Sequence, residues 1–169
     1  MAQYLTTSLM LVATIIALKI FYSVWTGGPL ATQTIASWIS SGNLSINWSV
    51  KIDSLTAIML VVVNFVSLLV HLYSLGYMSE DKSIARFMSY LSLFTFFMLA
   101  LVTSDNFVQL FFGWEGVGVA SYLLIGFWHH KDSANNAAIK AFVTNRVGDF
   151  GLMIAVALIF FTFGTVEYS

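Results

Sequence analysis

The chain has 169 residues, of which 59% are hydrophobic and only 9% are charged. This composition, with a mean hydropathy of +0.85, excludes an ordinary soluble domain and indicates a multi-pass membrane protein. Basic and acidic residues nearly balance, so no bulk positive charge is available to attract nucleic acid. The sequence has no cysteine, which excludes disulfides, cysteine-ligated zinc and iron–sulfur clusters.

Five segments are apolar over a length that can cross a membrane, which takes roughly 20 helical residues for about 30 Å of hydrocarbon. We predict an all-α, polytopic bundle of five transmembrane helices that forms a single membrane domain over residues 1–169. The predicted helices cover about 4–25, 52–75, 84–102, 107–128 and 137–163. The first carries no signal-peptide features, so we expect it to be retained.

The connections between these helices carry weaker signals. Residues 26–29, Thr-Gly-Gly-Pro, end the first helix. Residues 44–50 alternate apolar and polar side chains, which is compatible with a short strand or hairpin. Trp38 and Trp48 suit a membrane interface. Residues 104–106, Ser-Asp-Asn, are suited to cap the fourth helix, and residues 129–136 are expected to form a short polar loop.

Basic residues predict the orientation. The connections after the second and fourth helices hold most of them, whereas those after the first and third hold only Lys51. The positive-inside rule then places the N-terminus and the basic connections on the cytoplasmic or matrix side. The basic residues on that side are Lys82, Arg86, Lys131 and Lys140.

Glu115 is an acidic residue within the fourth apolar segment. It lies eight residues after Phe107, which places it roughly 12 Å into the bilayer, near the midplane. Ionisable groups in hydrocarbon are energetically unfavourable and usually serve proton or ion movement. The alternative is a structural hydrogen bond between two helices. Glycines surround Glu115 and favour close helix packing.

Charged residues on the fifth segment offer partners for Glu115. Arg146 and Asp149 are three residues apart and therefore share a helix face. They form either a coupling pair that changes the field at Glu115 or a mutually neutralising pair with no transport role. Lys140 is either an anchor at the membrane boundary or a residue for proton uptake.

Histidines are the remaining titratable groups of interest. His71 lies on the second helix on the same face as Asn64, and it is either a proton relay or an interfacial residue. The adjacent His129 and His130 are better explained as a solvated loop than as a metal site. The sequence contains no catalytic nucleophile motif, phosphate-binding glycine loop or set of haem or metal ligands.

With these features in place, the chain resembles the antiporter-like membrane subunits of respiratory complex I, specifically the NADH dehydrogenase subunit 5 family, and related chains of multisubunit sodium/proton antiporters. The matching segments occur in family order and spacing. They are residues 111–128 (Phe-Phe-Gly-Trp-Glu-Gly-Val-Gly … Phe-Trp), 73–78, 86–87, 101–106 and 140–149.

The resemblance implies proton translocation coupled to quinone reduction elsewhere in a complex. By this resemblance Glu115 is the key membrane carboxylate, and Arg146 and Asp149 belong to its charge relay. The resemblance also implies that this chain binds no NADH, flavin, metal or other cofactor. It also implies other membrane-arm subunits as partners, and either the mitochondrial inner membrane or a bacterial plasma membrane as the location.

The family's central lysines lie beyond the helices found here. We therefore expect a truncated fragment, or a split subunit whose other chain completes the proton site. Two alternatives to pumping are a purely structural piece of the membrane arm and a piece of a sodium/proton antiporter.

Overall fold

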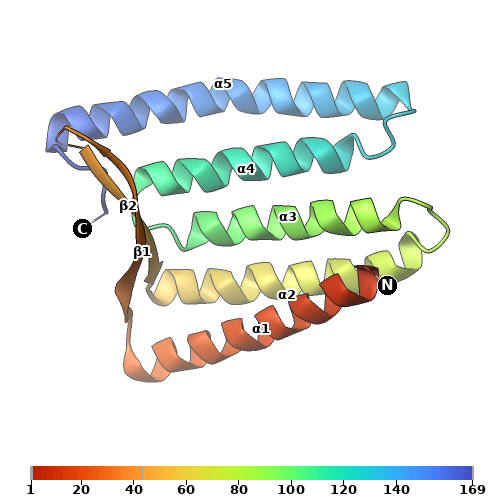
Figure 1. The fold of residues 1–169 in the computed structure, drawn as a ribbon, viewed down its shortest axis with the longest axis horizontal. Helices are drawn as coiled ribbons and strands as arrows, with labels where there is room; N and C mark the ends of the chain where they lie inside the picture. Colours follow the sequence, from red (N-terminus) through yellow and green to blue (C-terminus); the bar gives the residue numbers. More distant parts are fainter. Residues whose placement is uncertain (1, 43, 169) are drawn as a thin grey trace.

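The structure is a computed structural model that describes residues 2–42 and 44–168. Five helices are joined by short connections and one β-hairpin (Figure 1). The elements are α1 (Ala2–Gly27), β1 (Leu30–Ser41), β2 (Leu44–Ile52), α2 (Ser54–Tyr77), α3 (Ile84–Val102), α4 (Phe107–Ile125) and α5 (Asp132–Phe163). All five helices are long and apolar enough to cross a membrane, which confirms the predicted membrane bundle.

The helices lie side by side in chain order, with α1 and α5 at opposite edges (Figure 1). Successive helices run in opposite directions, as short connections require. The hairpin, the α3–α4 connection and the C-terminus gather at one end, whereas the α2–α3 and α4–α5 connections lie at the other (Figure 1). The two connections predicted to be basic therefore share one end of the bundle.

Local sequence accounts for most helix ends. α1 stops at Gly27, and the next residue, Gly28, has a φ of +84°, a conformation that favours glycine. Asp53 caps α2 by accepting a hydrogen bond from the Thr56 N–H at 2.8 Å. Asn106 caps α4 in the same way through the Gln109 N–H at 2.8 Å, which confirms the predicted cap.

Two predicted boundaries, the end of the fourth helix and the start of the fifth, were wrong by more than two residues, and the others agree within two. The helix predicted from residue 52 begins at Ser54, because Ile52 still belongs to β2 and Asp53 is the cap. The fourth helix ends at Ile125, and Gly126 through His130 form turns. The polar loop predicted to extend to residue 136 becomes helical at Asp132, since an acidic residue is favourable in a first turn and polar residues there can face water.

The hairpin accounts for the uncharged stretch after α1. Strands β1 and β2 pair antiparallel from Leu30 opposite Ile52 to Ser41 opposite Leu44, with bulges along the way. The alternation at residues 44–50 predicted β2, whereas β1 carried no recognised pattern. Trp38 and Trp48 pack edge-on against Phe112 of α4 at 5.8 and 5.2 Å between ring centroids, so the hairpin rests on the end of the bundle.

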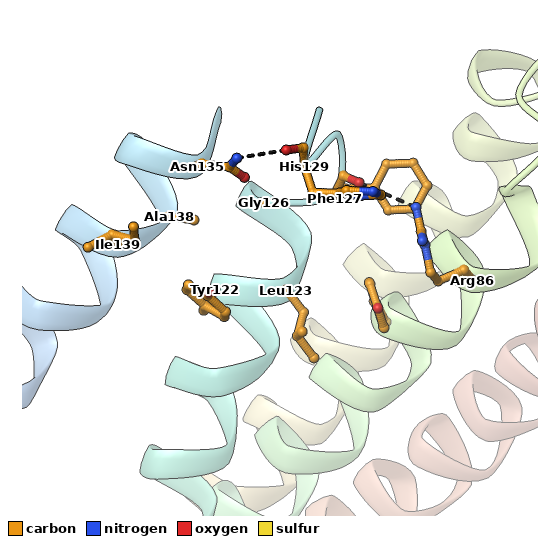
Figure 2. A pocket seen from close by; sticks show the side chains of 10 residues that line it. Arg86, Tyr122, Leu123, Gly126, Phe127, His129, Asn135, Ala138 and Ile139 are labelled. Atoms are coloured by element: carbon orange, nitrogen blue, oxygen red, sulfur yellow. Dashed lines mark hydrogen bonds between the residues drawn. The ribbon is translucent and has the colours of Figure 1, made fainter. Parts of the chain in front are cut away.

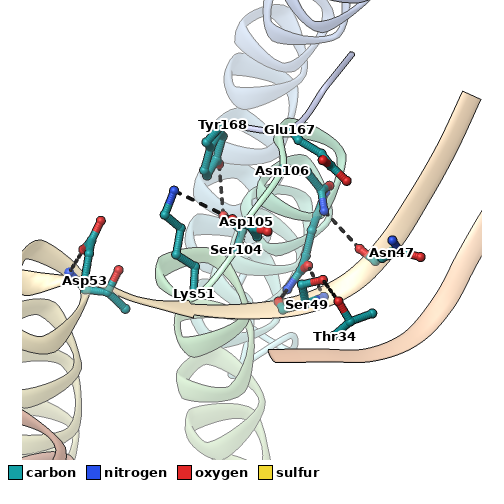
Figure 3. A network of polar contacts seen from close by, with 12 residues as sticks. Thr34, Asn47, Ser49, Lys51, Asp53, Ser104, Asp105, Asn106, Glu167 and Tyr168 are labelled. Atoms are coloured by element: carbon teal, nitrogen blue, oxygen red, sulfur yellow. Dashed lines mark hydrogen bonds and ion pairs between the residues drawn. The ribbon is translucent and has the colours of Figure 1, made fainter. Parts of the chain in front are cut away.

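Polar contacts also attach the hairpin to α4. The Gln109 side chain donates to the Ser49 carbonyl at 2.9 Å and accepts from the Ser49 N–H at 3.1 Å. Asn106 donates to the Asn47 carbonyl at 3.0 Å (Figure 3). Because Gln109 is completely buried, these bonds replace hydration that both partners have lost.

Glycines bring α3 and α4 into close contact. A Cβ atom on Gly113 would lie 2.7 Å from the backbone of Leu101, and one on Gly116 would lie 2.0 Å from the ring of Phe97. These positions therefore admit no side chain without movement of α3. This supports the packing explanation for two glycines next to Glu115.

Candidate functional site

A cluster of charged side chains lies between α4 and α5. The Arg146 guanidinium of α5 donates to the Glu115 carboxylate of α4. The same guanidinium nitrogen lies 3.8 Å from a carboxylate oxygen of Asp149. The structure thus brings together three of the five predicted site residues, with one cation between two anions.

Trp114 adds a fourth member to this cluster. Its indole N–H donates to the Asp149 carboxylate at 2.8 Å, which makes a second link from α4 to α5. Adjacent residues on a helix point about 100° apart, so Trp114 and Glu115 reach Asp149 and Arg146 separately. Asp149 is thereby held by a neutral donor in addition to the guanidinium.

The three charged groups differ in their access to the surroundings. The Asp149 side chain is 9% exposed and that of Glu115 is 21% exposed, whereas that of Arg146 is 44% exposed. Arg146 also stacks over the Phe142 ring, with the guanidinium carbon 4.7 Å from the centroid. The cation is therefore supported by an aromatic ring and by carboxylates from two helices.

The contact between α4 and α5 is loose at Gly118, beside the cluster. The nearest atom to a Cβ placed on Gly118 would be the Asn145 amide nitrogen at 3.9 Å, so this glycine leaves room beside the cluster without a close contact. The opposite face of α5 is covered by none of the described residues. It exposes large apolar side chains, including Val147, Phe150 and Phe161.

Lys140 lies outside the cluster. It is on α5 six residues before Arg146, which places it about 9 Å nearer the basic end of the bundle. Its side chain is exposed and forms no ion pair with any carboxylate in the described part of the chain. The structure therefore keeps both predicted roles of Lys140 open.

His71 lies in a different place, between α2 and α3. Its side chain is completely buried, and its Nδ1 lies 2.8 Å from the Ser67 carbonyl oxygen. Its Nε2 lies 3.4 Å from the Ser92 hydroxyl, while the Ser67 hydroxyl lies 2.6 Å from that of Thr95. All its hydrogen-bond partners are neutral, and none belongs to the Glu115 cluster.

A second polar network closes the hairpin end of the bundle (Figure 3). Lys51 lies 3.8 Å from Asp105, and the hydroxyl groups of Tyr168 and Ser104 are 3.1 Å apart. Partial burial of the Tyr168 hydroxyl, together with the nearby Asp105 charge, raises its pKa above its ordinary value. The network fastens the chain after α5 to the α3–α4 connection.

Two contacts were not predicted from the sequence. Trp114 bonds to Asp149 in the charged cluster, and Gln109 bonds to Ser49 of the hairpin. An indole beside Glu115 gave no signal of its own, because tryptophan is common near membrane interfaces. Gln109 lies only three residues into α4 and was assigned no partner. Among the described residues, no three histidine or acidic side chains converge as metal ligands would.

Comparisons with known proteins agree with this architecture. Residues 38–88 match the family described as NADH-ubiquinone oxidoreductase (complex I), chain 5 N-terminus. Residues 104–169 match the family described as NADH:quinone oxidoreductase/Mrp antiporter, transmembrane part. The two matches include the hairpin's second strand and all of α2, α4 and α5.

Relatives extend the similarity over the entire chain. NADH-quinone oxidoreductase subunit L of Rickettsia felis is 53% identical over 169 residues, which is 100% of this chain and 26% of that protein. NADH-ubiquinone oxidoreductase chain 5 of Arabidopsis thaliana is 54% identical over 165 residues, which is 98% of this chain and 25% of that protein. The chain thus spans about a quarter of the length of these relatives.

Solved structures share the fold at lower identity. A chain of an archaeal respiratory membrane complex, the membrane-bound sulfane sulfur reductase, superposes with a TM-score of 0.83 at 21% identity and covers 98% of this chain and 33% of that one. A chain of the Mrp complex from Dietzia gives a TM-score of 0.73 at 20% identity, over 99% of this chain and 20% of that one. With these matches, the chain belongs to the antiporter-like membrane subunits of the complex I and Mrp family.

Proposed function

We propose that this chain forms part of a proton-translocating, antiporter-like subunit in the membrane arm of an NADH:ubiquinone oxidoreductase. The observation that carries the proposal is the Glu115–Arg146–Asp149 cluster, in which one cation contacts two carboxylates from two apolar helices. A carboxylate in such a position is chemically suited to take up and release a proton when its neighbouring cation moves.

The proposed step is a movement of Arg146. While its guanidinium contacts Glu115, the glutamate is held as an anion. When the guanidinium shifts toward Asp149, which Trp114 holds in place, Glu115 loses its counter-charge and takes up a proton. The return of Arg146 favours release of that proton. Redox chemistry in other subunits supplies the driving force, and NADH, flavin and quinone bind outside this chain.

Lys140 and His71 have subordinate places in this proposal. Lys140 is exposed between the basic end of the bundle and Arg146, which suits a residue on the proton uptake side. His71, with Ser67, Ser92 and Thr95, forms a largely buried group of polar side chains within α2 and α3. This group is suited to proton exchange inside the bundle, and its hydrogen bonds do not include the Glu115 cluster.

The partners follow from the size of the relatives. They are about four times longer than this chain, and we propose that the corresponding additional helices supply a cationic partner for Glu115. Other membrane-arm subunits would contact the assembled unit. Relatives from bacteria and from a plant make both a bacterial plasma membrane and the mitochondrial inner membrane suitable locations.

Replacement of Glu115 by glutamine tests the proposal. The assembled complex is placed in liposomes, and proton movement is measured per NADH oxidised. Glu115→Gln is expected to lower this ratio with normal assembly, because the amide keeps the shape but exchanges no proton. The matched control is Glu167→Gln, an exposed carboxylate outside the helices, and it is expected to leave the ratio unchanged. An unchanged ratio in Glu115→Gln would contradict the role of Glu115.

A structural role without pumping is the second possibility, and it predicts the same ratio in both variants. A third possibility comes from the family match that includes the Mrp antiporter. Proton movement that requires sodium and proceeds without NADH or quinone would favour it.

A further inference from the structure

We propose that the cavity between the ends of α3, α4 and α5 binds the phosphate group of a membrane phospholipid. The cavity has a volume of about 410 Å³ and lies at the end of the bundle that holds the basic connections (Figure 2). That volume lies within the usual range of small-ligand sites. This inference is independent of the proton-transfer proposal, since none of the Glu115 cluster lines the cavity.

Arg86 supplies the positive charge of the cavity. Its guanidinium stacks on the Phe127 ring, with the carbon 4.9 Å from the centroid, and donates one long hydrogen bond of 3.4 Å to the Phe127 carbonyl (Figure 2). It forms no ion pair with a carboxylate in residues 2–42 or 44–168. Most of its five N–H donors are therefore available, and their planar arrangement matches two oxygens of a phosphate.

Asp81 on the α2–α3 connection is engaged mainly with neutral donors. It accepts a hydrogen bond from the Ser83 N–H at 2.7 Å and another from the Trp128 indole at 3.1 Å. These two bonds, with a smaller contribution from the positive charges of Arg86 and His130, lower the pKa of the Asp81 carboxyl below its ordinary value. Asp81 forms no ion pair with Arg86, so the Arg86 guanidinium can still donate to a phosphate.

Two tyrosines add hydrogen-bonding capacity beside Arg86. Tyr90 of α3 and Tyr122 of α4 both line the cavity, and neither hydroxyl bonds to another residue in the described part of the chain. The wall from α5 is its first two turns, near the end of the helix that carries the positive end of its dipole. Two hydroxyl donors, one guanidinium and this helix end suit an oxygen-rich anion.

Apolar residues form the rest of the wall and favour a lipid over a free anion. Leu123, Ala138 and Ile139 line the cavity on the side that continues along the helices. Arg86 lies in the first turn of α3, whereas Ala138 and Ile139 lie in the second turn of α5, so the charge is nearer the end of the bundle than these apolar groups, as phosphate is relative to acyl chain in a bilayer leaflet. An aqueous phosphate ion would gain nothing from the apolar wall.

Local photocrosslinking in the assembled complex tests the site. Ile139 is replaced by benzoylphenylalanine, and the delipidated complex receives labelled dioleoylphosphatidylglycerol. Crosslinking to this chain is expected to fall roughly tenfold in Arg86→Gln, the loss that corresponds to one strong charge-assisted bond. Lys82→Gln is the control, because it removes a cation from the same end outside the cavity, and it is expected to retain crosslinking.

Two competitors identify what is recognised. Unlabelled dioleoylglycerol, which has the same acyl chains without phosphate, is expected to compete poorly, and so is inorganic phosphate. Tyr90→Phe removes one hydroxyl while it keeps the ring, and we expect a two- to threefold loss; this variant serves if Arg86→Gln fails to assemble. Equal crosslinking in Arg86→Gln and Lys82→Gln, or in Tyr90→Phe and the parent complex, would overturn the proposal. Effective competition by dioleoylglycerol would overturn phosphate recognition, and effective competition by inorganic phosphate would overturn the lipid as its source.

Discussion

Two regions of the molecule use polar side chains in opposite ways. Between α2 and α3, and between α4 and the hairpin, His71 and Gln109 are completely buried and bonded to neutral partners. Between α4 and α5 the polar groups are charged, Glu115 and Arg146 are partly exposed, and one cation is shared between two carboxylates.

This difference in burial and charge suggests that the His71 and Gln109 contacts are fixed and that the Arg146 contact is the one that changes. A buried neutral group loses its only partners when it moves, and leaving such a group unpaired costs about 1–3 kcal/mol. In the proposed step Arg146 exchanges one carboxylate for the other and so keeps a negatively charged partner in both positions. We infer that the α2–α4 side of the bundle is the rigid support and that the α4–α5 contact is the part that changes.

The largest effect on stability is expected from Gln109→Leu. The change keeps the side-chain volume but leaves the Ser49 N–H and carbonyl buried without partners, which should cost about 3 kcal/mol. The measurement is the heat inactivation of the assembled complex. Gln33→Leu removes an exposed amide of the other strand, whose single bond to the Ala31 carbonyl is 3.3 Å long, and should cost much less. Equal losses would show that the buried end of the hairpin is no more rigid than its surface.

Gly116→Ala should have the next largest effect. Its new methyl group would lie 2.0 Å from the Phe97 ring, and overpacking of this kind costs about 1–3 kcal/mol. The control is Gly151→Ala on α5, where no atom lies within 4 Å of the added carbon. The same heat inactivation should show a loss only for Gly116→Ala. A comparable loss at Gly151 would mean that the uncovered face of α5 is packed against another element in the complex.

Asp53→Ala should cost about 1 kcal/mol at neutral pH through loss of the α2 cap. The Thr56 backbone N–H holds the pKa of the Asp53 carboxyl below its ordinary 3.8. A lowered pKa in the folded state stabilises the protein above about pH 4, and this stabilisation is lost as the pH falls through the folded-state value. Heat inactivation of the parent complex and of Asp53→Asn, which keeps a capping side chain without the charge, is compared from neutral to acid pH. The stability difference between the two should shrink as the Asp53 carboxyl becomes protonated. A difference that stays constant over this pH range would contradict the prediction.

Arg146→Gln should have the smallest effect on stability, below about 1 kcal/mol, because the Arg146 side chain is only half-buried and a glutamine amide can still donate a hydrogen bond to Glu115. Heat inactivation again measures the change. A loss as large as that of Gln109→Leu would remove the distinction between the fixed and the movable region.

The sequence predicted the five helices, and it singled out Glu115, Arg146 and Asp149, which the structure brings together. Apolar runs of spanning length report helices directly, and a glutamate within such a run is conspicuous whatever its partners are. The i, i+3 spacing placed Arg146 and Asp149 on one face, but it did not show that Arg146 contacts Glu115 on another helix.

The remainder depended on tertiary contacts. β1 has no alternating pattern because the strand is bulged and exposed along its length. The start of α5 at Asp132 was missed because a polar first turn looks like a loop when only hydropathy is read. The partners of Trp114 and Gln109 lie 35 and 60 residues away, and no local signal specifies contacts over such separations.

The central claim is that Arg146 acts on proton transfer through Glu115, and a double-mutant comparison tests it most directly. Protons moved per NADH oxidised are measured in liposomes for Glu115→Gln, Arg146→Gln and the double variant. If Arg146 works only by controlling Glu115, the double variant should lose no more than Glu115→Gln alone. A double variant whose loss equals the product of the two single losses would show that the residues act independently and would contradict the account.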